Sequence, residues 1–257
     1  MSDDIALHLG SLKPADPASE SANRNFWSSD LTALAEHHTA AHGSHTSHSY
    51  VVAHDGSATW GVPGEPQMAA IKVARDLSLN TFTLELTYHA TTAFAQNWLI
   101  EHGCPPERIA QTNKDFMLPA DDLTVGIEQQ IRESGTRYKV LGSQTWDSDP
   151  CETWTVAQDS GASQAPIRVY LEEGDDIAHT YTLREGAFAT EEAALDWLDD
   201  RSSPLPKPPE YRGEDAALRT GAALARSAGS SGIPKAGLDV QSPPAGPVQR
   251  PNSGRSI

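Results

Sequence analysis

The sequence predicts an α+β fold in which helices pack on a mixed or antiparallel sheet. In the first half of the chain, helix-like periodicity alternates with a hairpin signal and one clear strand. In the second half, one helical pattern precedes four strand-like runs with short linkers, and a last helical pattern follows them. Consecutive strands with short connections favour an antiparallel meander. We therefore expect a β-hairpin with helices in the first half, and a helix, a four-stranded meander and a helix in the second.

Composition divides the chain into three parts. Residues 1–24 are predicted to be a flexible segment, because residues 11–25 lack periodicity. Residues 25–202 are predicted to form the α+β core, as one unit or as two subdomains, residues 25–118 and 119–202. Half of the 18 prolines lie after Ser202, so residues 203–257 are predicted to be a disordered Pro/Ala-rich tail. No internal repeat is evident in the sequence.

Two helices are predicted early in the core. The first spans about residues 29–42, because Ser28 or Ser29 is a good N-cap and Gly43 ends the pattern. Its apolar face, spaced at i, i+3, i+4 and i+7, comprises Leu31, Leu34, Ala35 and His38. The second starts at Pro66, a residue favoured in the first turn of a helix. Its apolar stripe comprises Ala70, Val73, Ala74 and Leu77.

A hairpin, a strand and a third helix complete the first half. Asp55-Gly56 is favoured in a type I′ turn, so residues 50–54 and 57–60 are predicted to pair as a β-hairpin. Apolar and polar residues alternate over residues 81–88, which indicates a strand buried on one face. A helix is predicted over residues 92–102, ending at Gly103.

The second half contains a helix, four strands and a closing helix. The helix is predicted over residues 120–134, and the strands over residues 137–145, 152–158, 166–172 and 178–185. Linkers such as Asp147-Ser148-Asp149-Pro150 have the composition of turns. The closing helix begins at Thr190, where Glu191 and Glu192 are favourable in the first turn.

The charge of the chain excludes some classes of partner. The formal net charge is -16, and residues 25–202 hold 27 acidic and 10 basic side chains. An acidic core repels phosphate backbones, which disfavours nucleic-acid binding, and no apolar run of about 18 residues predicts a membrane span. Two cysteines and an acidic N-terminus predict a cytoplasmic protein with reduced thiols. The expected partner is a protein or a small molecule that meets an acidic surface.

Histidines are concentrated in residues 37–54. His38 and His42 are four residues apart on the first predicted helix, and His45 and His48 follow it in the sequence. That spacing suits a tetrahedral metal site, and neutral imidazole binds zinc, nickel or copper. We expect a divalent metal, zinc or nickel, at His38, His42, His45 and His48. The alternative is that these histidines are packing residues or solvated loop residues.

Three residues are candidates for catalysis. Cys104 follows His102 closely, which invites a thiolate, although an inert structural cysteine is the commoner case. Glu85 and Asp121 could belong to a pair of carboxylates of the kind that hydrolyses glycosides. Glu101, Asp115 and Asp122 offer the same chemistry. Phosphate-binding loops, dinucleotide fingerprints and Gly-x-Ser-x-Gly elbows are absent, which disfavours nucleoside triphosphatases, NAD enzymes and serine hydrolases.

Parts of the chain resemble a family of uncharacterised actinobacterial proteins. The resemblance lies in residues 44–60, in residues 82–104 with Ala93-Phe94-Ala95-Gln96-Asn97-Trp98, and in residues 184–197. Some members of that family are described as glycosyl hydrolases, so the resemblance implies a hydrolase without assigning catalytic residues. The number of strand–helix patterns is too small for a (β/α)₈ barrel.

Two functional hypotheses follow. The first is a binding or accessory protein with an acidic surface, which could respond to a metal through its histidines. The second is a hydrolase, of glycosides for example, that uses paired carboxylates. The first is favoured because the sequence lacks known catalytic signatures.

Overall fold

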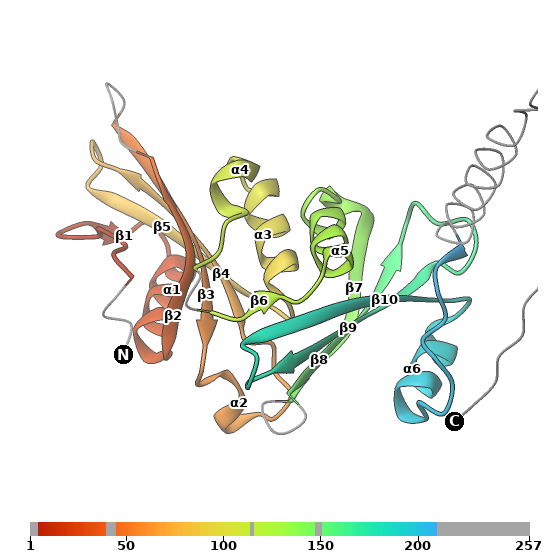
Figure 1. Cartoon of the computed structure of the whole chain (residues 1–257). Helices are drawn as coiled ribbons and strands as arrows, with labels where there is room; N and C mark the ends of the chain where they lie inside the picture. The colour runs from red at the N-terminus through yellow and green to blue at the C-terminus, as the bar shows by residue number, and fades with distance from the viewer. Residues whose placement is uncertain (1–4, 40–44, 114–115, 147–150, 210–257) are drawn as a thin grey trace, which may run out of the picture. The chain divides into compact units, whose positions relative to one another are not determined.

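Two five-stranded sheets form the framework of the α+β fold in the computed structural model, which describes residues 5–39, 45–113, 116–146 and 151–209 (Figure 1). The first sheet contains β1 (Lys13–Pro14), β2 (Leu31–His38), β3 (Thr46–Asp55), β4 (Met68–Asp76) and β5 (Thr81–His89). The second contains β6 (Leu118–Pro119), β7 (Tyr138–Trp146), β8 (Glu152–Asp159), β9 (Ile167–Asp175) and β10 (Thr180–Phe188). The helices are α1 (Pro17–Ser28), α2 (Ala58–Gly61), α3 (Thr92–Glu101), α4 (Pro106–Ile109), α5 (Asp122–Arg132), the 3₁₀-helix η1 (Gly135–Arg137) and α6 (Glu191–Asp199).

Helices cover both faces of each sheet. Phe26 of α1 lies in the core on one face of the first sheet, and Leu99 of α3 lies in the core on the other face. On the second sheet, Ile127 of α5 packs on one face and Trp197 of α6 on the other. Phe94 of α3 also joins the core beneath α5, so α3 and α5 together form the junction between the two sheets (Figure 1).

The chain forms a helix and then a strand where the sequence predicts a flexible segment and then a helix. Helix α1 begins within residues 1–24, because the side chain of Asp16 accepts a hydrogen bond from the Ser19 amide at 2.7 Å and Pro17 occupies the first turn. Residues 31–38 then form β2. A β-bulge between Ala33 and Ala35 interrupts the alternation of β2, so its buried residues acquire a helix-like spacing. Both sequence predictions are wrong at these positions.

The helix predicted from Pro66 is also wrong, since residues 68–76 form β4. This strand lies between β3 and β5 and is covered by α1 on one face and by α3 on the other. Both faces of the strand therefore carry buried apolar residues, and the strand loses the alternation that would distinguish it from a helix. Tertiary packing overrides the helix propensity of its three alanines, Ala69, Ala70 and Ala74.

The hairpin predicted at Asp55-Gly56 is wrong in its second strand. Residues 58–61 form α2, and β3 pairs instead with β2 and β4. The other predictions for the core are confirmed. The bounds expected for β5, α3, α5, the meander β7 to β10 and the start of α6 lie within two residues of those observed, except that β9 and β10 each extend three residues further at their C-terminal ends. Most of the predicted tail, residues 210–257, lies outside the described residues.

The two sheets belong to two repeats of one topology, which contradicts the expectation that no repeat exists. We call residues 13–101 the first repeat and residues 118–199 the second repeat. Each consists of a short strand, a helix, a four-stranded antiparallel meander and a helix, and α2 is an insertion in the first. In each, the short strand pairs in parallel with the last strand of the meander, Lys13 with Thr81 and Leu118 with Thr180.

Irregularities of the backbone recur at equivalent places in the repeats. Leu31 pairs with Asp55 in the first repeat and Tyr138 pairs with Asp159 in the second. In β2 the bulge lies between Ala33 and Ala35, and in β7 it lies between Val140 and Gly142. Both bulges begin the same number of residues after Leu31 and Tyr138, respectively. A bulge is a specific feature of a sheet rather than a random defect, so its recurrence supports a common architecture.

The turn before the last strand of the meander is also the same. The carboxylate of Asp76 accepts hydrogen bonds from the amides of the second and third residues after it, and Asp175 does likewise. Each turn ends on a residue with positive φ, Asn80 at 53° and His179 at 52°. Side chains of this type tolerate the left-handed region better than most.

One hydrogen bond between helix and sheet is repeated as well. The buried hydroxyl of Ser19 in α1 accepts from the amide of Leu84 at 3.2 Å, and the buried hydroxyl of Thr124 in α5 accepts from the amide of Leu183 at 3.0 Å. Each hydroxyl lies three residues after the aspartate that caps its helix. The two repeats thus attach their first helix to their last strand in one way.

A sequence trace of the repeat is present once the structure aligns it. Residues 81–99 correspond to residues 180–198, and eight positions hold the same residue in both segments. These positions in the first repeat are Thr81, Thr83, Leu84, Ala90, Thr91, Ala95, Trp98 and Leu99.

In the described part of the chain, no helix is both long enough and apolar enough to cross a membrane.

Candidate functional site

The predicted histidine site is not assembled in the described residues. His38 lies on β2, where its Nδ1 is 2.7 Å from the Ser49 hydroxyl and its Nε2 is 3.0 Å from the Glu36 carboxylate. His48 lies on β3 next to Ser49 in sequence, so its ring points to the opposite face of the first sheet. There it stacks on Tyr50, with ring centroids 6.1 Å apart. His38 and His48 therefore do not share a site, and the helical spacing that suggested one is wrong.

The other two predicted ligands do not restore the site. His42 lies outside the described residues, and His45 is exposed at the start of the segment that leads into β3. Within residues 5–39, 45–113, 116–146 and 151–209, no group of three or more histidine, cysteine, aspartate or glutamate side chains is placed to hold a metal ion.

Two of the carboxylates suggested for catalysis are engaged in ion pairs. Glu85 lies on β5 with its carboxylate 3.1 Å from the Lys72 ammonium and 4.0 Å from His102 Nε2. Asp121 caps α5 and pairs with Arg184 at 2.5 Å. Hydrogen bonds from Arg184, and then from Thr124, hold the pKa of Asp121 below its ordinary value. Both groups have structural partners and do not converge on a common cleft.

Cys104 is not placed as a nucleophile. It is 2% exposed in the core between α3 and the first sheet. Burial, with a smaller contribution from Glu107, raises the pKa of its thiol to about 12. The thiolate is the reactive form of cysteine, so Cys104 behaves as a packing residue near neutral pH. Neither Cys104 nor Cys151 forms a disulfide bond. Of the weaker carboxylate candidates, Glu101 and Asp122 are exposed and Asp115 lies outside the described residues.

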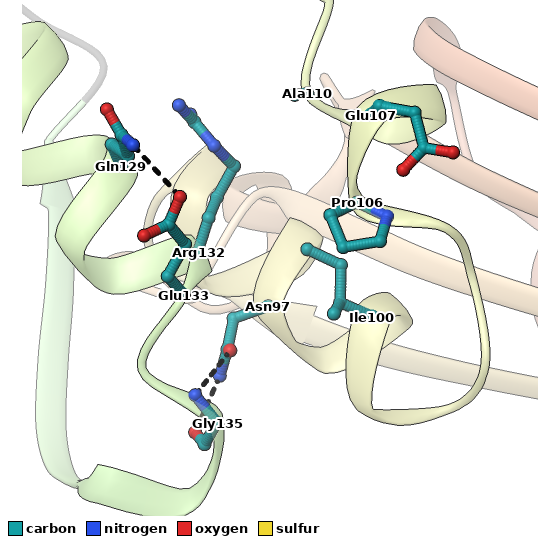
Figure 2. A pocket seen from close by; sticks show the side chains of 9 residues that line it. All are labelled: Asn97, Ile100, Pro106, Glu107, Ala110, Gln129, Arg132, Glu133 and Gly135. Atoms are coloured by element: carbon teal, nitrogen blue, oxygen red, sulfur yellow. Dashed lines mark hydrogen bonds between the residues drawn. The ribbon is translucent and has the colours of Figure 1, made fainter.

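A cavity of about 670 Å³ lies at the junction of the two repeats, and we call it the junction cavity (Figure 2). Helices α3, α4 and α5 supply its walls, together with the first residue of η1. The lining residues are Asn97, Ile100, Pro106, Glu107, Ala110, Gln129, Arg132, Glu133 and Gly135. A volume of roughly 300 to 1,000 Å³ is typical of small-molecule sites, which often lie where two structural units meet.

Polar contacts fix the walls of the junction cavity. The side-chain nitrogen of Asn97 donates to the Gly135 carbonyl oxygen at 3.0 Å, and its side-chain oxygen accepts from the backbone amide of Gly135 at 3.1 Å (Figure 2). These two bonds connect α3 with the start of η1. Gly135 has a φ of +54°, in the left-handed region that glycine enters without strain. The guanidinium of Arg132 lies 3.3 Å from Gln96 Oε1 and 3.7 Å from Glu128 Oε2. The cavity is thus bounded by a preformed and hydrogen-bonded wall.

Through Arg132, the junction cavity adjoins a buried group of acidic residues beneath α5. Glu128 is 8% exposed and accepts a short hydrogen bond from the Tyr181 hydroxyl. Burial raises the pKa of Glu128 above its ordinary value, although Tyr181 and Arg132 oppose that shift. Burial, together with the charge of Glu128, raises the pKa of the partly buried Glu172 to about 8. Glu172 is therefore largely protonated near neutral pH.

The first repeat shows that the scaffold does not require these polar groups. Val73 is equivalent to Glu172, and Phe82 is equivalent to Tyr181; both belong to the apolar core beneath α1. Counted from the helix caps, Asn23 of α1 is equivalent to Glu128 of α5. The second repeat has thus replaced apolar core residues with ionisable ones on the face that α5 covers. Buried ionisable residues are costly to stability, so their presence points to a role beyond packing.

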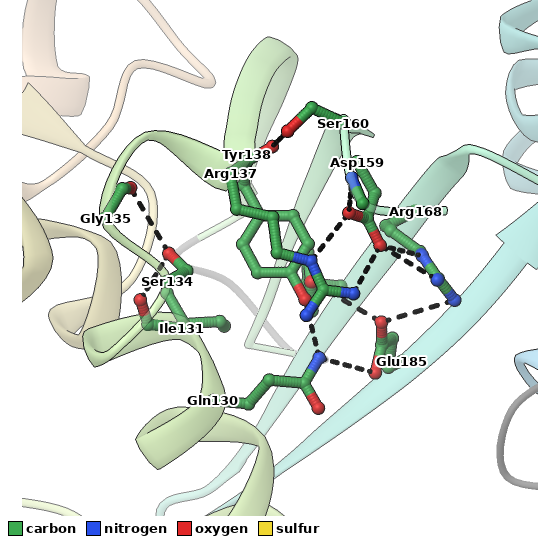
Figure 3. Close-up of polar contacts among 12 residues, drawn as sticks. Gln130, Ile131, Ser134, Gly135, Arg137, Tyr138, Asp159, Ser160, Arg168 and Glu185 are labelled. Carbon is green, nitrogen blue, oxygen red and sulfur yellow. Dashed lines mark hydrogen bonds and ion pairs between the residues drawn. The ribbon is translucent and has the colours of Figure 1, made fainter. Parts of the chain in front are cut away.

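In a second polar network on the same face, the charged side chains pair with one another, so we do not consider this network a ligand site (Figure 3). Asp159 accepts from Arg137 at 2.7 and 2.8 Å and from Arg168 at 3.1 and 2.9 Å, and Arg168 pairs with Glu185 at 3.6 Å. Burial alone would raise the pKa of Asp159, but hydrogen bonds from Arg137, Gly161 and Arg168 lower it below its ordinary value. The opposite charges of this network neutralise one another, and its ion pairs connect η1, β8, β9 and β10.

Comparisons with family models, with curated proteins and with solved structures found no match. The resemblance to an actinobacterial family therefore stays a prediction.

Proposed function

We propose that the chain is a binding protein whose ligand occupies the junction cavity. The cavity itself carries this proposal, because its lining combines the apolar side chains of Ile100, Pro106 and Ala110 with the charged side chains of Glu107, Arg132 and Glu133. Ligand sites in proteins have this character: apolar side chains bury the ligand, and a few polar groups orient it. The proposal retains the first functional hypothesis and gives it a place in the structure.

The construction of the cavity supports a dedicated role. Helix α4 follows α3 directly and belongs to neither of the two repeats. The cavity therefore depends on an addition to the repeated unit rather than on the unit itself. Its walls are rigid because Asn97 and Gly135 hold α3 and η1 together, and rigid walls reduce the conformational entropy lost on binding.

The charge of the chain supports a protein or small-molecule partner rather than a nucleic acid. Residues 25–202 carry 27 acidic and 10 basic side chains, and this excess lies in the part of the chain that forms the two repeats. An acidic surface of this kind repels polyanions and attracts cations.

Binding of a neutral probe tests the proposal. The uncharged alcohol n-hexanol is titrated into the full chain, and binding is followed by saturation-transfer NMR of the alcohol. Replacing the exposed lining residue Gln129 with tryptophan places an indole ring in part of the cavity and is expected to weaken binding strongly. The matched control replaces the exposed Leu195 of α6 with tryptophan and leaves binding unchanged. Equal binding by the Gln129→Trp and parent proteins would overturn the proposal.

A hydrolase is a second candidate, favoured by one observation. The charge of Glu128 contributes to the raised pKa of Glu172, burial raises the pKa of both carboxyl groups, and a raised pKa suits a general acid. This replaces the earlier candidates Glu85, Asp121 and Cys104. Turnover of 4-nitrophenyl glycosides and esters by the parent protein, lost in both Glu128→Gln and Glu172→Gln, would support a hydrolase. Background rates in all three proteins would rule it out for these substrates.

A further inference from the structure

We propose that Ser49 is the nucleophile of an acyl-transfer centre, with His38 as its base and the N-terminal segment as its cover. This centre does not depend on the junction cavity, because Ser49 alternates along β3 with Val51, which lies in the core beneath α1. The proposal follows from a continuous chain of hydrogen bonds, from a buried arginine and from the position of one backbone carbonyl.

Three side chains on neighbouring strands have the contacts of a nucleophile, a base and a group that orients the base. Ser49 of β3 and His38 of β2 are cross-strand partners, and the Ser49 hydroxyl oxygen lies 2.7 Å from His38 Nδ1. His38 Nε2 lies 3.0 Å from a carboxylate oxygen of Glu36, two residues earlier on β2. A hydroxyl next to a base that a third group orients is the general arrangement of an activated nucleophile.

The buried guanidinium of Arg75 sets the direction of these hydrogen bonds. Its Nη2 lies 2.5 Å from the Ser49 hydroxyl oxygen, and a guanidinium can only donate. Ser49 therefore accepts from Arg75 and directs its own proton to His38 Nδ1. With Nδ1 as acceptor, the neutral imidazole carries its proton on Nε2 and donates it to Glu36. His38 is thus oriented to take the serine proton.

Arg75 also holds a backbone carbonyl beside the serine. The Leu7 oxygen accepts from Nε at 3.1 Å and from Nη2 at 2.5 Å, and the same Nη2 contacts Ser49. Arg75 is 5% exposed, and in the described part of the chain its partners are this carbonyl and two serine hydroxyls, with no carboxylate. A buried charge without a counterion is costly to stability, but it stabilises the negative oxygen that forms when a hydroxyl attacks a carbonyl.

Residues 5–9, which we call the N-terminal strap, lie where an acyl substrate would bind. Ser49 is 0% exposed, and the strap, which has no helix or strand structure, packs in the core on this face through Ile5 and Leu7. Leu7 and Phe82 also line an apolar cavity of about 480 Å³. The strap thus places a carbonyl on Arg75 next to apolar surface, as an ester of an apolar acid would. Displacement of the strap admits the substrate.

The second repeat shows that the sheet does not require these polar groups. His38 and Ser49 are equivalent to Thr145 and Thr153, which keep a cross-strand contact between their hydroxyls at 3.4 Å without a base. The position of the arginine holds Gly174. The base and the cation therefore occur together in the first repeat, which points to a role beyond packing.

The proposed reaction transfers an acyl group from an ester to water. The Ser49 oxygen forms a bond to the acyl carbon while its proton moves to His38 Nδ1, and Arg75 donates to the oxyanion. The bond between the acyl carbon and the ester oxygen breaks, and His38 returns the proton to the leaving alcohol. Water then gives a proton to His38 and attacks the acyl-serine, which releases the carboxylic acid and restores Ser49.

Labelling with a rhodamine fluorophosphonate tests the proposal. The full chain is incubated with the probe at pH 8, and peptide mass spectrometry identifies the modified residue. The Ser49 oxygen displaces fluoride from phosphorus and its proton passes to His38, so Ser49 is expected to carry the label. His38→Gln removes the base and is expected to slow labelling about a hundredfold. The double variant Ile5→Ser and Leu7→Ser weakens the packing of the strap and is expected to speed labelling about tenfold.

A matched control separates Ser49 from serines in general. Ser78 is exposed, and its hydroxyl donates to the Asp76 carboxylate at 2.6 Å without a histidine, so Ser78→Ala is expected to leave labelling unchanged. Circular dichroism checks that each variant is folded, and if the strap variant unfolds, the rates of the parent and of His38→Gln decide. Absence of label on Ser49, or equal rates in the parent and His38→Gln proteins, would overturn the proposal.

Discussion

His89 and Phe188 occupy equivalent positions in the two repeats and contact equivalent tryptophans. The ring of His89 lies 6.4 Å from that of Trp98 at an interplanar angle of 47°, and the ring of Phe188 lies 6.0 Å from that of Trp197 at 46°. The scaffold thus accepts a phenyl ring at this place, although the first repeat holds an imidazole. Nε2 of His89 is buried without a hydrogen-bond partner in the described structure.

The position of His89 leads to a prediction about acid stability. Burial lowers the pKa of His89 to about 4, so the folded protein disfavours the imidazolium that forms readily in the unfolded chain. Because the folded pKa is below the unfolded value, the unfolded state binds more protons, and stability is lost as pH falls from about 6.5 towards about 4. His89→Phe is expected to raise the free energy of unfolding by about 2 kcal/mol at pH 5.

Urea denaturation of His89→Phe and parent proteins at pH 5 and at pH 8 measures this difference. At pH 8 the gain should be much smaller, because both states hold a neutral imidazole. An equal gain at the two pH values would mean that protonation of His89 does not limit stability, and that packing alone explains the effect.

Glu172 leads to the opposite dependence on pH. The folded pKa of Glu172, about 8, is above the ordinary value for glutamate. Its favourable contribution to the free energy of unfolding is therefore present below about pH 4.5 and is lost as pH rises through about 8. Glu172→Gln keeps the shape of the protonated form and should be more stable than the parent at pH 8. We expect a gain of about 1 to 2 kcal/mol after allowing for the part of the side chain that water reaches.

Thermal unfolding of Glu172→Gln at pH 5 and pH 8 tests this expectation. The matched control is Glu173→Gln on the same strand, where the side chain is exposed and no gain at pH 8 is expected. If Glu172→Gln is no more stable than the parent at pH 8, the carboxyl group is ionised in the folded protein, and the acid proposed for a hydrolase is absent.

The repeated hydrogen bond between helix and sheet predicts two equal effects. Ser19→Ala and Thr124→Val each remove the acceptor for a buried strand amide, at Leu84 and Leu183 respectively. Leaving a buried donor unsatisfied costs about 1 to 3 kcal/mol, and the two variants should lose similar amounts. Chemical denaturation measures both, with Ser28→Ala on the exposed side of α1 as a control that changes little. A large loss in only one variant would contradict the equivalence of the repeats.

Cys104 is expected to be unreactive in the folded protein. With its pKa raised to about 12 by burial, only about one thiol in ten thousand is ionised at pH 8. Iodoacetamide added at pH 8, followed by peptide mass spectrometry, should leave Cys104 unmodified until the protein is unfolded in urea. Rapid alkylation in the folded protein would show an accessible thiolate and revive Cys104 as a nucleophile.

The sequence predicted the second repeat far better than the first, and the reason lies in how each strand is buried. Strands β7 to β10 are separated by clear turn residues, so the meander is readable. In the first repeat, β4 is covered on both faces, and the bulge in β2 gives it a helix-like spacing. Helix α1 was missed because Ser19 and Phe26 are its only buried residues, although Asp16-Pro17 is a recognisable start.

The candidate site was not predictable from local patterns. Ile100, Glu107 and Glu133 come from three helices, and only their packing at the junction of the repeats brings them together. The repeat itself offered a usable signal, since Thr-x-Thr-Leu recurs at Thr81 and Thr180 and Ala-Thr recurs at Ala90 and Ala189. Aligning the halves would have shown Glu172 at the place of Val73 as a polar residue that the scaffold does not require.

The most direct measurement of the central claim is a map of the binding site in solution. Backbone amide shifts of the ¹⁵N-labelled full chain are recorded during titration with n-hexanol. We predict that the amides of Ile100, Ala110, Arg132 and Gly135 shift together with one saturation curve, while those of α6 stay fixed. Shifts that spread over acidic residues throughout the surface, or that concentrate away from α3, α4 and α5, would contradict a ligand site at the junction of the repeats.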